Sequence, residues 1–182
     1  KPYTKAQLSE VLNNVLGNLA NRNFMFAKKY FDGNISRKNE LSPNAKNTLT
    51  EVNDLASEIG KCYANYEVRK ATKLFIDIAR IGNKYFNETQ PWKEIKTDSA
   101  KAEETLFICS EILRIISIVA SPVIPKSMDK LRKMLGLNEE FFWQNLAKNQ
   151  RNFIIDEVER LYRKIDDNEI EKQINLLEKK KR

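Results

Sequence analysis

Apolar residues recur at spacings of three and four along most of the chain, which is the period of an α-helix with one buried face. The first stripe predicts a helix over residues 6–31, closed by the stop signal Asp32-Gly33. Its members are Leu8, Leu12, Val15, Leu19, Phe26 and Tyr30. After a polar connection over residues 34–41, further helices are predicted over residues 43–62, 66–87, 98–120, 126–135, 139–147 and 168–180.

Local signals support these helices and their packing. Ser42-Pro43 is typical of an N-cap followed by a proline in the first turn, and Asp98 is a second candidate N-cap. Residues 98–120 are apolar on most sides, so we expect this helix at the centre of the fold. Gly82 lies on an apolar helix face, where its missing side chain favours a close contact with another helix.

Together these elements predict an all-α fold, an antiparallel helix bundle with extra helices at its C-terminal end. We expect one helical domain over residues 1–165. Residues 166–182 are expected to form a charged C-terminal helix that either packs back on the bundle or leads to a further module.

A row of polar residues borders the apolar stripe of the first predicted helix. Asn14, Asn18 and Arg22 are four residues apart, so they are neighbours on one flank of that helix. A carboxamide offers a donor and an acceptor to the edge of a nucleobase, and a guanidinium adds several donors. An unpaired base also needs an aromatic surface for stacking. Trp92, which follows Pro91 at a predicted helix end, is the candidate.

The same residues also fit a purely structural interpretation, which the spacing alone favours. Asparagines beside a core often bond to neighbouring backbone groups, and an arginine there often pairs with a carboxylate. A tryptophan after a helix-ending proline is often a cap packed on the core.

Composition narrows the classes of function. The chain has no histidine, which excludes histidine-based nucleophilic catalysis and HExxH zinc sites. It lacks the GxxxxGK[ST] and GxGxxG motifs, and its two cysteines, Cys62 and Cys109, form no cluster. We therefore expect no catalytic residue and no metal site. Unclustered cysteines fit a reducing compartment, so a cytoplasmic location is expected.

Charge and hydropathy bear on the partner. A net charge of +7 favours a polyanion such as nucleic acid, or an acidic membrane surface, although ordinary solubility also explains it. The longest apolar stretch, residues 106–124, is interrupted by Glu111 and Arg114. No transmembrane span and no membrane partner are therefore predicted.

Three blocks of the sequence carry a resemblance to a known family. The first is N-x-x-x-N-L-x-x-R-N, from Asn14 to Asn23, followed by F-x-x-x-x-F-D-G up to Gly33. The second is IGNKYFNETQPWK, residues 81–93, and the third is SPVIPKS, residues 121–127. In this order they resemble the anticodon-binding domain of methionyl-tRNA synthetase, a class I aminoacyl-tRNA synthetase. The likeness covers residues 12–135, and LYRKID, residues 161–166, resembles the family's C-terminal segment more loosely.

The resemblance implies a bundle that reads the CAU anticodon of methionine tRNA for a methionine–tRNA ligase. By motif match, Asn18 and Arg22 would contact anticodon bases. Trp92 would stack on one of them, with the first-position cytosine favoured, and Pro91 would shape its loop. Asn14 lies on the same ridge and is a further candidate.

The resemblance also implies two partners, the tRNA and a catalytic domain of the same polypeptide. ATP, methionine and the family's zinc-binding insertion belong outside the present fragment, which lacks HIGH-type and KMSKS-type signatures. The fragment alone is therefore expected to be non-catalytic and to need no cofactor.

Other functions stay open. A helical protein-interaction or scaffold domain should expose an apolar groove. A nonspecific RNA-binding module should bind altered anticodons as well as CAU. An enzyme based on carboxylates comes last, because no pair of acidic residues stands out.

Overall fold

A computed structural model describes residues 11–37, 40–137, 143–147 and 150–162 of the chain. Its helices are the π-helical turn η1 (Leu12–Gly17), α2 (Asn18–Phe31), α3 (Pro43–Ala64), α4 (Val68–Thr89), α5 (Pro91–Glu94), α6 (Ser99–Val119), α7 (Pro125–Met134) and the 3-10 turn η2 (Trp143–Ala147). Two short strands, β1 (Asn34–Ser36) and β2 (Asn152–Ile154), complete the described elements. The predicted helix bundle is confirmed, with this small sheet as an addition.

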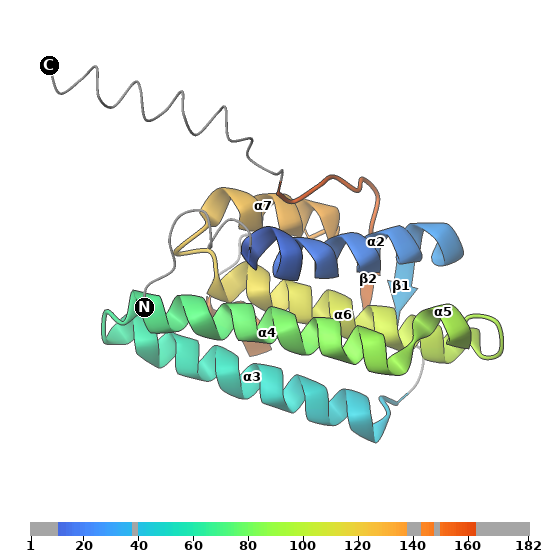
Figure 1. Ribbon diagram of the computed structural model, residues 1–182, viewed down its shortest axis with the longest axis horizontal. Coiled ribbons are helices and arrows are strands. Elements are labelled where there is room, and N and C mark those ends of the chain that lie inside the picture. Colours follow the sequence, from blue (N-terminus) through green and yellow to red (C-terminus); the bar gives the residue numbers. More distant parts are fainter. Residues whose placement is uncertain (1–10, 38–39, 138–142, 148–149, 163–182) are drawn as a thin grey trace, which may run out of the picture.

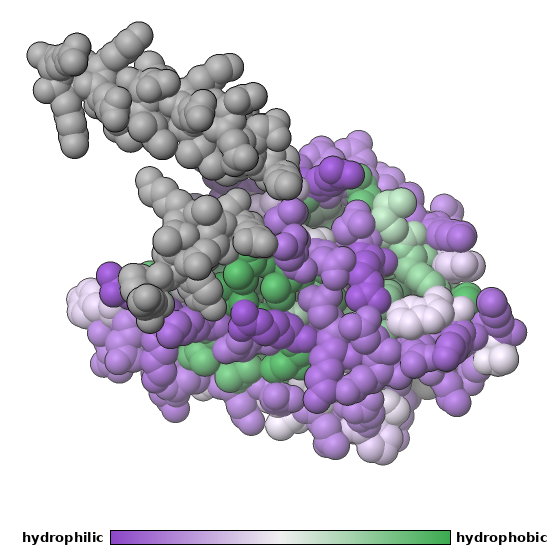
Figure 2. Space-filling model, viewed as in Figure 1, coloured by the Kyte–Doolittle hydropathy of each residue, from purple (hydrophilic) through white to green (hydrophobic). Residues whose placement is uncertain are grey.

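Helix α6 lies at the centre of the bundle, as predicted, because it is apolar on nearly every side. Every residue from Thr105 to Ala120 is buried. The helix packs against α2, α3, α4, α5 and α7. Figure 1 shows α3 and α4 side by side along one side of α6, with α2 and α7 along another. Figure 2 shows that hydrophilic side chains cover most of this face of the molecule, with apolar side chains visible between them.

The predicted caps are present. The Ser42 hydroxyl accepts a hydrogen bond from the Ala45 N–H at 3.2 Å, and Pro43 occupies the first turn of α3. The Asp98 carboxylate accepts from the backbone N–H groups of Ala100 and Lys101. These side chains satisfy backbone donors that have no partner within the helix.

The first helix differs from the prediction in its N-terminal half. Residues 12–17 form a π-helical turn, which takes more residues per turn than an α-helix and so shifts the buried face. In the α-helical half that follows, the buried residues lie to one side of Phe26 and Tyr30, so Phe26 is only partly buried and Tyr30, predicted to lie in the buried stripe, is 43% exposed. The buried row consists of Leu12, Leu16, Leu19, Ala20, Asn23, Phe24 and Ala27.

The connection predicted over residues 34–41 contains a strand. β1 pairs antiparallel with β2, and Ile35 lies opposite Phe153. The Phe153 ring lies 5.7 Å from that of Phe107 on α6, so the strand pair covers part of the core. Three-residue strands carry too little alternation to be recognised from the sequence.

Some predictions fall outside the described residues. They include Leu8, the helix over residues 168–180 and the domain boundary at residues 165 and 166. Of the helix predicted over residues 139–147, the described part is the 3-10 turn η2. No helix in the described part of the chain is long and apolar enough to cross a membrane.

Candidate nucleic-acid interface

Helices α2 and α4 lie close together because Gly82 has no side chain. A Cβ atom at this position would lie 2.5 Å from Cδ2 of Leu19, which is fully buried. The predicted close approach at Gly82 is thus confirmed. It allows polar side chains along the outer edge of the two helices to reach each other.

Asn83 joins the two helices next to this contact. Its Nδ2 donates to the backbone carbonyls of Val15, at 2.8 Å, and Ala79, at 3.0 Å. Its Oδ1 accepts from Nδ2 of Asn18 at 3.2 Å. Asn18 is exposed, and this bond holds its amide group in one orientation. The π-helical turn, Asn83 and Asn18 therefore form one connected unit.

One turn further along, Arg22 makes a second set of contacts with α4. Its terminal nitrogen donates to Oδ1 of Asn87 at 2.8 Å. Its Cζ lies 4.4 Å from the centre of the Phe86 ring and 5.9 Å from that of Trp92. Among the described residues its partners are an amide oxygen and two aromatic rings, rather than the carboxylate expected for a structural arginine. A guanidinium held over aromatic rings keeps further N–H donors for a ligand.

Trp92 is placed beside Arg22 by the turn that follows α4. Gln90 has φ 49°, a left-handed conformation that ends α4 and reverses the chain. Pro91 is buried and begins the short helix α5, where the sequence had predicted a loop. Trp92 is 40% exposed, and its ring lies 6.1 Å from that of Phe86 at an interplanar angle of 35°. The indole is therefore supported by Phe86 and still open to solvent.

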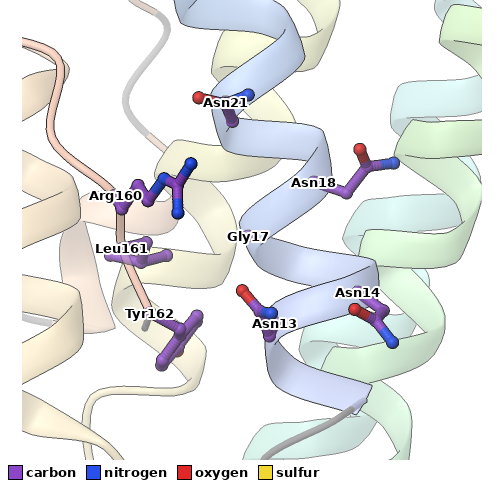
Figure 3. A pocket seen from close by; sticks show the side chains of 8 residues that line it. All are labelled: Asn13, Asn14, Gly17, Asn18, Asn21, Arg160, Leu161 and Tyr162. Carbon is purple, nitrogen blue, oxygen red and sulfur yellow. The ribbon is translucent and has the colours of Figure 1, made fainter. Parts of the chain in front are cut away.

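The structure thus brings Asn18, Arg22 and Trp92 to one edge of the bundle, with Pro91 in the turn that precedes the indole. Asn14 lies apart from them, one turn before Asn18. It is exposed and lines a groove of about 340 Å³ together with Asn13, Gly17, Asn18, Asn21 and the segment Arg160–Tyr162. In Figure 3, Asn18 extends toward α4, whereas Asn13 lies across the groove from Tyr162. Asn14 is therefore placed on the same ridge but not beside Trp92.

One asparagine of the sequence motif has a structural role. Asn23 is buried, and its Nδ2 donates to the Ser110 hydroxyl of α6 at 2.8 Å. It links α2 to the central helix. The amides of this helix therefore divide into a buried one that supports the fold and exposed ones that face solvent.

Sequence reasoning missed the residues of α4 that support the site. Asn83, Phe86 and Asn87 bond to or stack on Asn18 and Arg22. Asn83 and Asn87 are four residues apart, as are Asn18 and Arg22. The matching four-residue spacing could have predicted that these side chains pair across the two helices, since Asn83 and Asn87 lie within one of the blocks that carry the resemblance.

The ionisable groups near this edge of the bundle include exposed lysines and a buried thiol. Lys93, which directly follows Trp92, and Lys96, in the turn after α5, are exposed and supply positive charge. Burial raises the pKa of the Cys109 thiol far above its ordinary value, so this group stays protonated and is a poor nucleophile. Within the described ranges, no group of His, Cys, Asp or Glu side chains is arranged to hold a metal ion.

Comparison with solved structures identifies the class of fold. The free state of methionyl-tRNA synthetase from Mycobacterium tuberculosis superposes with a TM-score of 0.82, covering 90% of this chain and 35% of that chain at 22% identity. Its complex with methionyl-adenylate gives a TM-score of 0.80 over 89% of this chain and 34% of that chain, also at 22% identity. The chain thus has the same helical fold as the matching part of these two structures.

Sequence comparison gives the family. A family model described as the anticodon binding domain of methionyl tRNA ligase matches residues 35–178. The methionine–tRNA ligase of Phocaeicola vulgatus is 36% identical and that of Pyrococcus horikoshii 32% identical, over 90% and 91% of this chain. The chain belongs to this family of anticodon-binding domains. It spans 24% and 23% of those two ligases, about a quarter of their length, and corresponds to a fragment of such an enzyme.

Proposed function

We propose that the chain recognises the CAU anticodon of methionine tRNA and thereby directs a methionine–tRNA ligase to its substrate. The whole enzyme would attach methionine to this tRNA with ATP, in the cytoplasm, through a catalytic domain of the same polypeptide. The observation that carries the proposal is the meeting of Asn18, Arg22 and Trp92 at one exposed edge of the α2–α4 interface.

Each group has a distinct part in this mechanism. The Trp92 indole stacks on an unpaired base, for which the first-position cytosine is the favoured partner. Such stacking contributes about 1–3 kcal/mol per base. The Arg22 guanidinium and the Asn18 carboxamide then bond to base edges, because their orientations are already held by Asn87 and Asn83. Exposed lysines beside the indole attract the phosphates.

The preorganisation of these groups supports specific recognition. A side chain that is already bonded to its own protein loses less conformational freedom when it binds RNA. A base that does not match the fixed donors and acceptors leaves them without partners, which costs affinity. A nonspecific binder needs only charge and exposed rings.

The test is a titration of the chain with RNA hairpins whose loops carry CAU or an altered anticodon. We expect tighter binding of CAU, and loss of most of this preference in Trp92→Ala. Trp143→Ala is the matched control, because Trp143 is the chain's other tryptophan and packs beside Tyr63 on α3, away from the site. Equal affinity for all hairpins would show a nonspecific RNA-binding module instead.

A second test uses the intact enzyme. Trp92→Ala should lower the efficiency of tRNA charging while methionine adenylation, which needs no anticodon, stays nearly unchanged. An equal fall in both activities would assign Trp92 a packing role and contradict the proposal.

A further inference from the structure

The polar ridge of α2 continues past Arg22 as an aromatic row. Asn14, Asn18, Arg22, Phe26 and Tyr30 follow one another at intervals of four residues. Each is therefore a neighbour of the next on the helix surface, in a row that winds around the helix and changes from amide to cation to aromatic toward the C-terminal end. The sequence pattern predicts Phe26 and Tyr30 to be core residues, yet neither is fully buried.

These two rings belong to a continuous set of aromatic contacts that ends at Trp92. The Tyr30 and Phe26 ring centres are 4.4 Å apart, and those of Phe26 and Phe86 are 6.4 Å apart. Phe86 in turn contacts Trp92 at 6.1 Å. Phe26 and Phe86 are the inner members, whereas the two ends of the set, Tyr30 and Trp92, are exposed to 43% and 40%.

Tyr30 has the features of a base-stacking surface. Its ring is supported by Phe26, so it is held in place without being covered. The Lys29 ammonium lies 5.1 Å from the ring centre, where it supplies a cation for a phosphate next to a stacked base. An isolated exposed tyrosine would not suggest a binding site, but Tyr30 is connected to Trp92 through the ring contacts of Phe26 and Phe86.

We propose that Tyr30 is a second stacking surface, which takes another unpaired base of the same RNA loop that Trp92 binds. The inference rests on the proposed function, since it adds a contact to that site. The base lies on the exposed part of the Tyr30 ring, and Lys29 moves from the ring to the adjoining phosphate. The loop is then held at both ends of the aromatic set, with Arg22 between them.

The experiment measures binding of the full chain to the CAU hairpin and, in parallel, the fluorescence of an adenine analogue placed at successive loop positions. Tyr30→Ala should weaken binding about five- to tenfold, the lower end of the range for one stacked base, and should relieve quenching of the analogue at one position. Tyr30→Phe, which keeps the ring, should bind within about twofold of the wild type. Tyr30→Leu keeps apolar contact with Phe26 and should bind as weakly as Tyr30→Ala.

The control is Tyr66→Ala. Tyr66 is 92% exposed in the turn between α3 and α4, at the other end of the bundle from α5 (Figure 1). Wild-type affinity in Tyr30→Ala, with Trp92→Ala still impaired, would overturn the inference and leave the proposed function standing. Equal losses in Tyr30→Phe and Tyr30→Ala would also overturn it, because the hydroxyl rather than the ring would then be responsible. Absence of a CAU preference in the wild type is the separate result that would refute the proposed function.

Discussion

The side-chain amide of Asn83 donates to the backbone carbonyl of Val15 on the neighbouring helix, at 2.8 Å. Val15 lies within the π-helical turn η1, and a side chain that bonds into the helical ladder is one cause of such irregularities. The same Asn83 side chain accepts from Asn18. The irregular turn and the orientation of the proposed base-reading amide therefore depend on one residue of α4.

Asn83→Ala should weaken binding of the CAU hairpin about as much as Asn18→Ala does. The change removes the partner of Asn18 and leaves the Val15 carbonyl without its side-chain donor, so stability should also fall by about 1–3 kcal/mol. The double variant should be little worse than either single one, because both changes disrupt the same unit. Additive losses of affinity would show that the two residues act separately. Asn53→Ala, on the exposed side of α3, is the matched control.

Gly82→Ala should destabilise the protein by about 1–3 kcal/mol, because the added methyl would overlap the buried side chain of Leu19 and push α2 away from α4. Urea denaturation measures this. Gly17→Ala is the matched control with the opposite expectation. A Cβ at Gly17 would meet its nearest atoms at 3.4 Å, an ordinary contact, so this change should be neutral or should stabilise by about 0.5 kcal/mol. Similar effects of the two substitutions would refute the close-contact explanation.

Much of the bundle could be predicted because its signals are local. The caps at Ser42 and Asp98, the glycine contact at Gly82 and the apolar surface of α6 each depend on a few neighbouring residues. The ridge formed by Asn18 and Arg22 could be predicted for the same reason, since residues four apart on a helix must be neighbours.

The features that could not be predicted from the sequence depend on contacts between residues that are distant in the chain. The π-helical turn is held by Asn83, which is 68 residues away from Val15 in the chain. Nothing in residues 12–17 indicates it. The β1–β2 pair has the same origin, because Asn34 pairs with Ile154, which is 120 residues away in the chain. Long-range partners of this kind have no local periodicity.

Glu111→Ala should destabilise the protein by about 3–5 kcal/mol, because it removes the carboxylate that neutralises a buried guanidinium. Arg114 is 2% exposed, and its Nε donates to Oε2 of Glu111 at 2.9 Å. A terminal nitrogen of Arg114 also donates to the Leu146 carbonyl at 3.2 Å, which ties η2 to α6. The double variant Glu111→Leu/Arg114→Met should lose less than the single one, since no charge is then left buried. Glu88→Ala, which removes an exposed pair with Lys84, should cost no more than about 1 kcal/mol by the same urea measurement.

Glu94→Gln should raise the free energy of unfolding near neutral pH and leave it little changed in acid. Burial raises the pKa of the Glu94 carboxyl above 4.5, and the nearby charges of Asp98 and Glu104 raise it further, against an opposing effect of Lys101. Its Oε2 is buried without a hydrogen-bond partner in the described part of the chain. A raised pKa in the folded state means that folding favours the protonated carboxyl. Wild-type stability therefore has its full contribution from this group below pH 4.5 and loses it as the pH rises through the folded-state value.

The measurement for Glu94→Gln is urea denaturation of the wild type and the variant across the range from acid to neutral pH. The variant should exceed the wild type in free energy of unfolding only above pH 4.5, and the difference should then reach a plateau. The reason is that the neutral amide of the variant does not ionise. Glu58→Gln is a control of opposite sign, because hydrogen bonding and charge from Lys70 lower the pKa of Glu58, so its ionised form contributes to stability. That contribution is present above pH 4.5, and its loss in the variant should be small because the pair is exposed. If both substitutions shifted stability in the same direction at neutral pH, buried charge at Glu94 would not be the cause, and its carboxylate would have to be stabilised by a contact of its own.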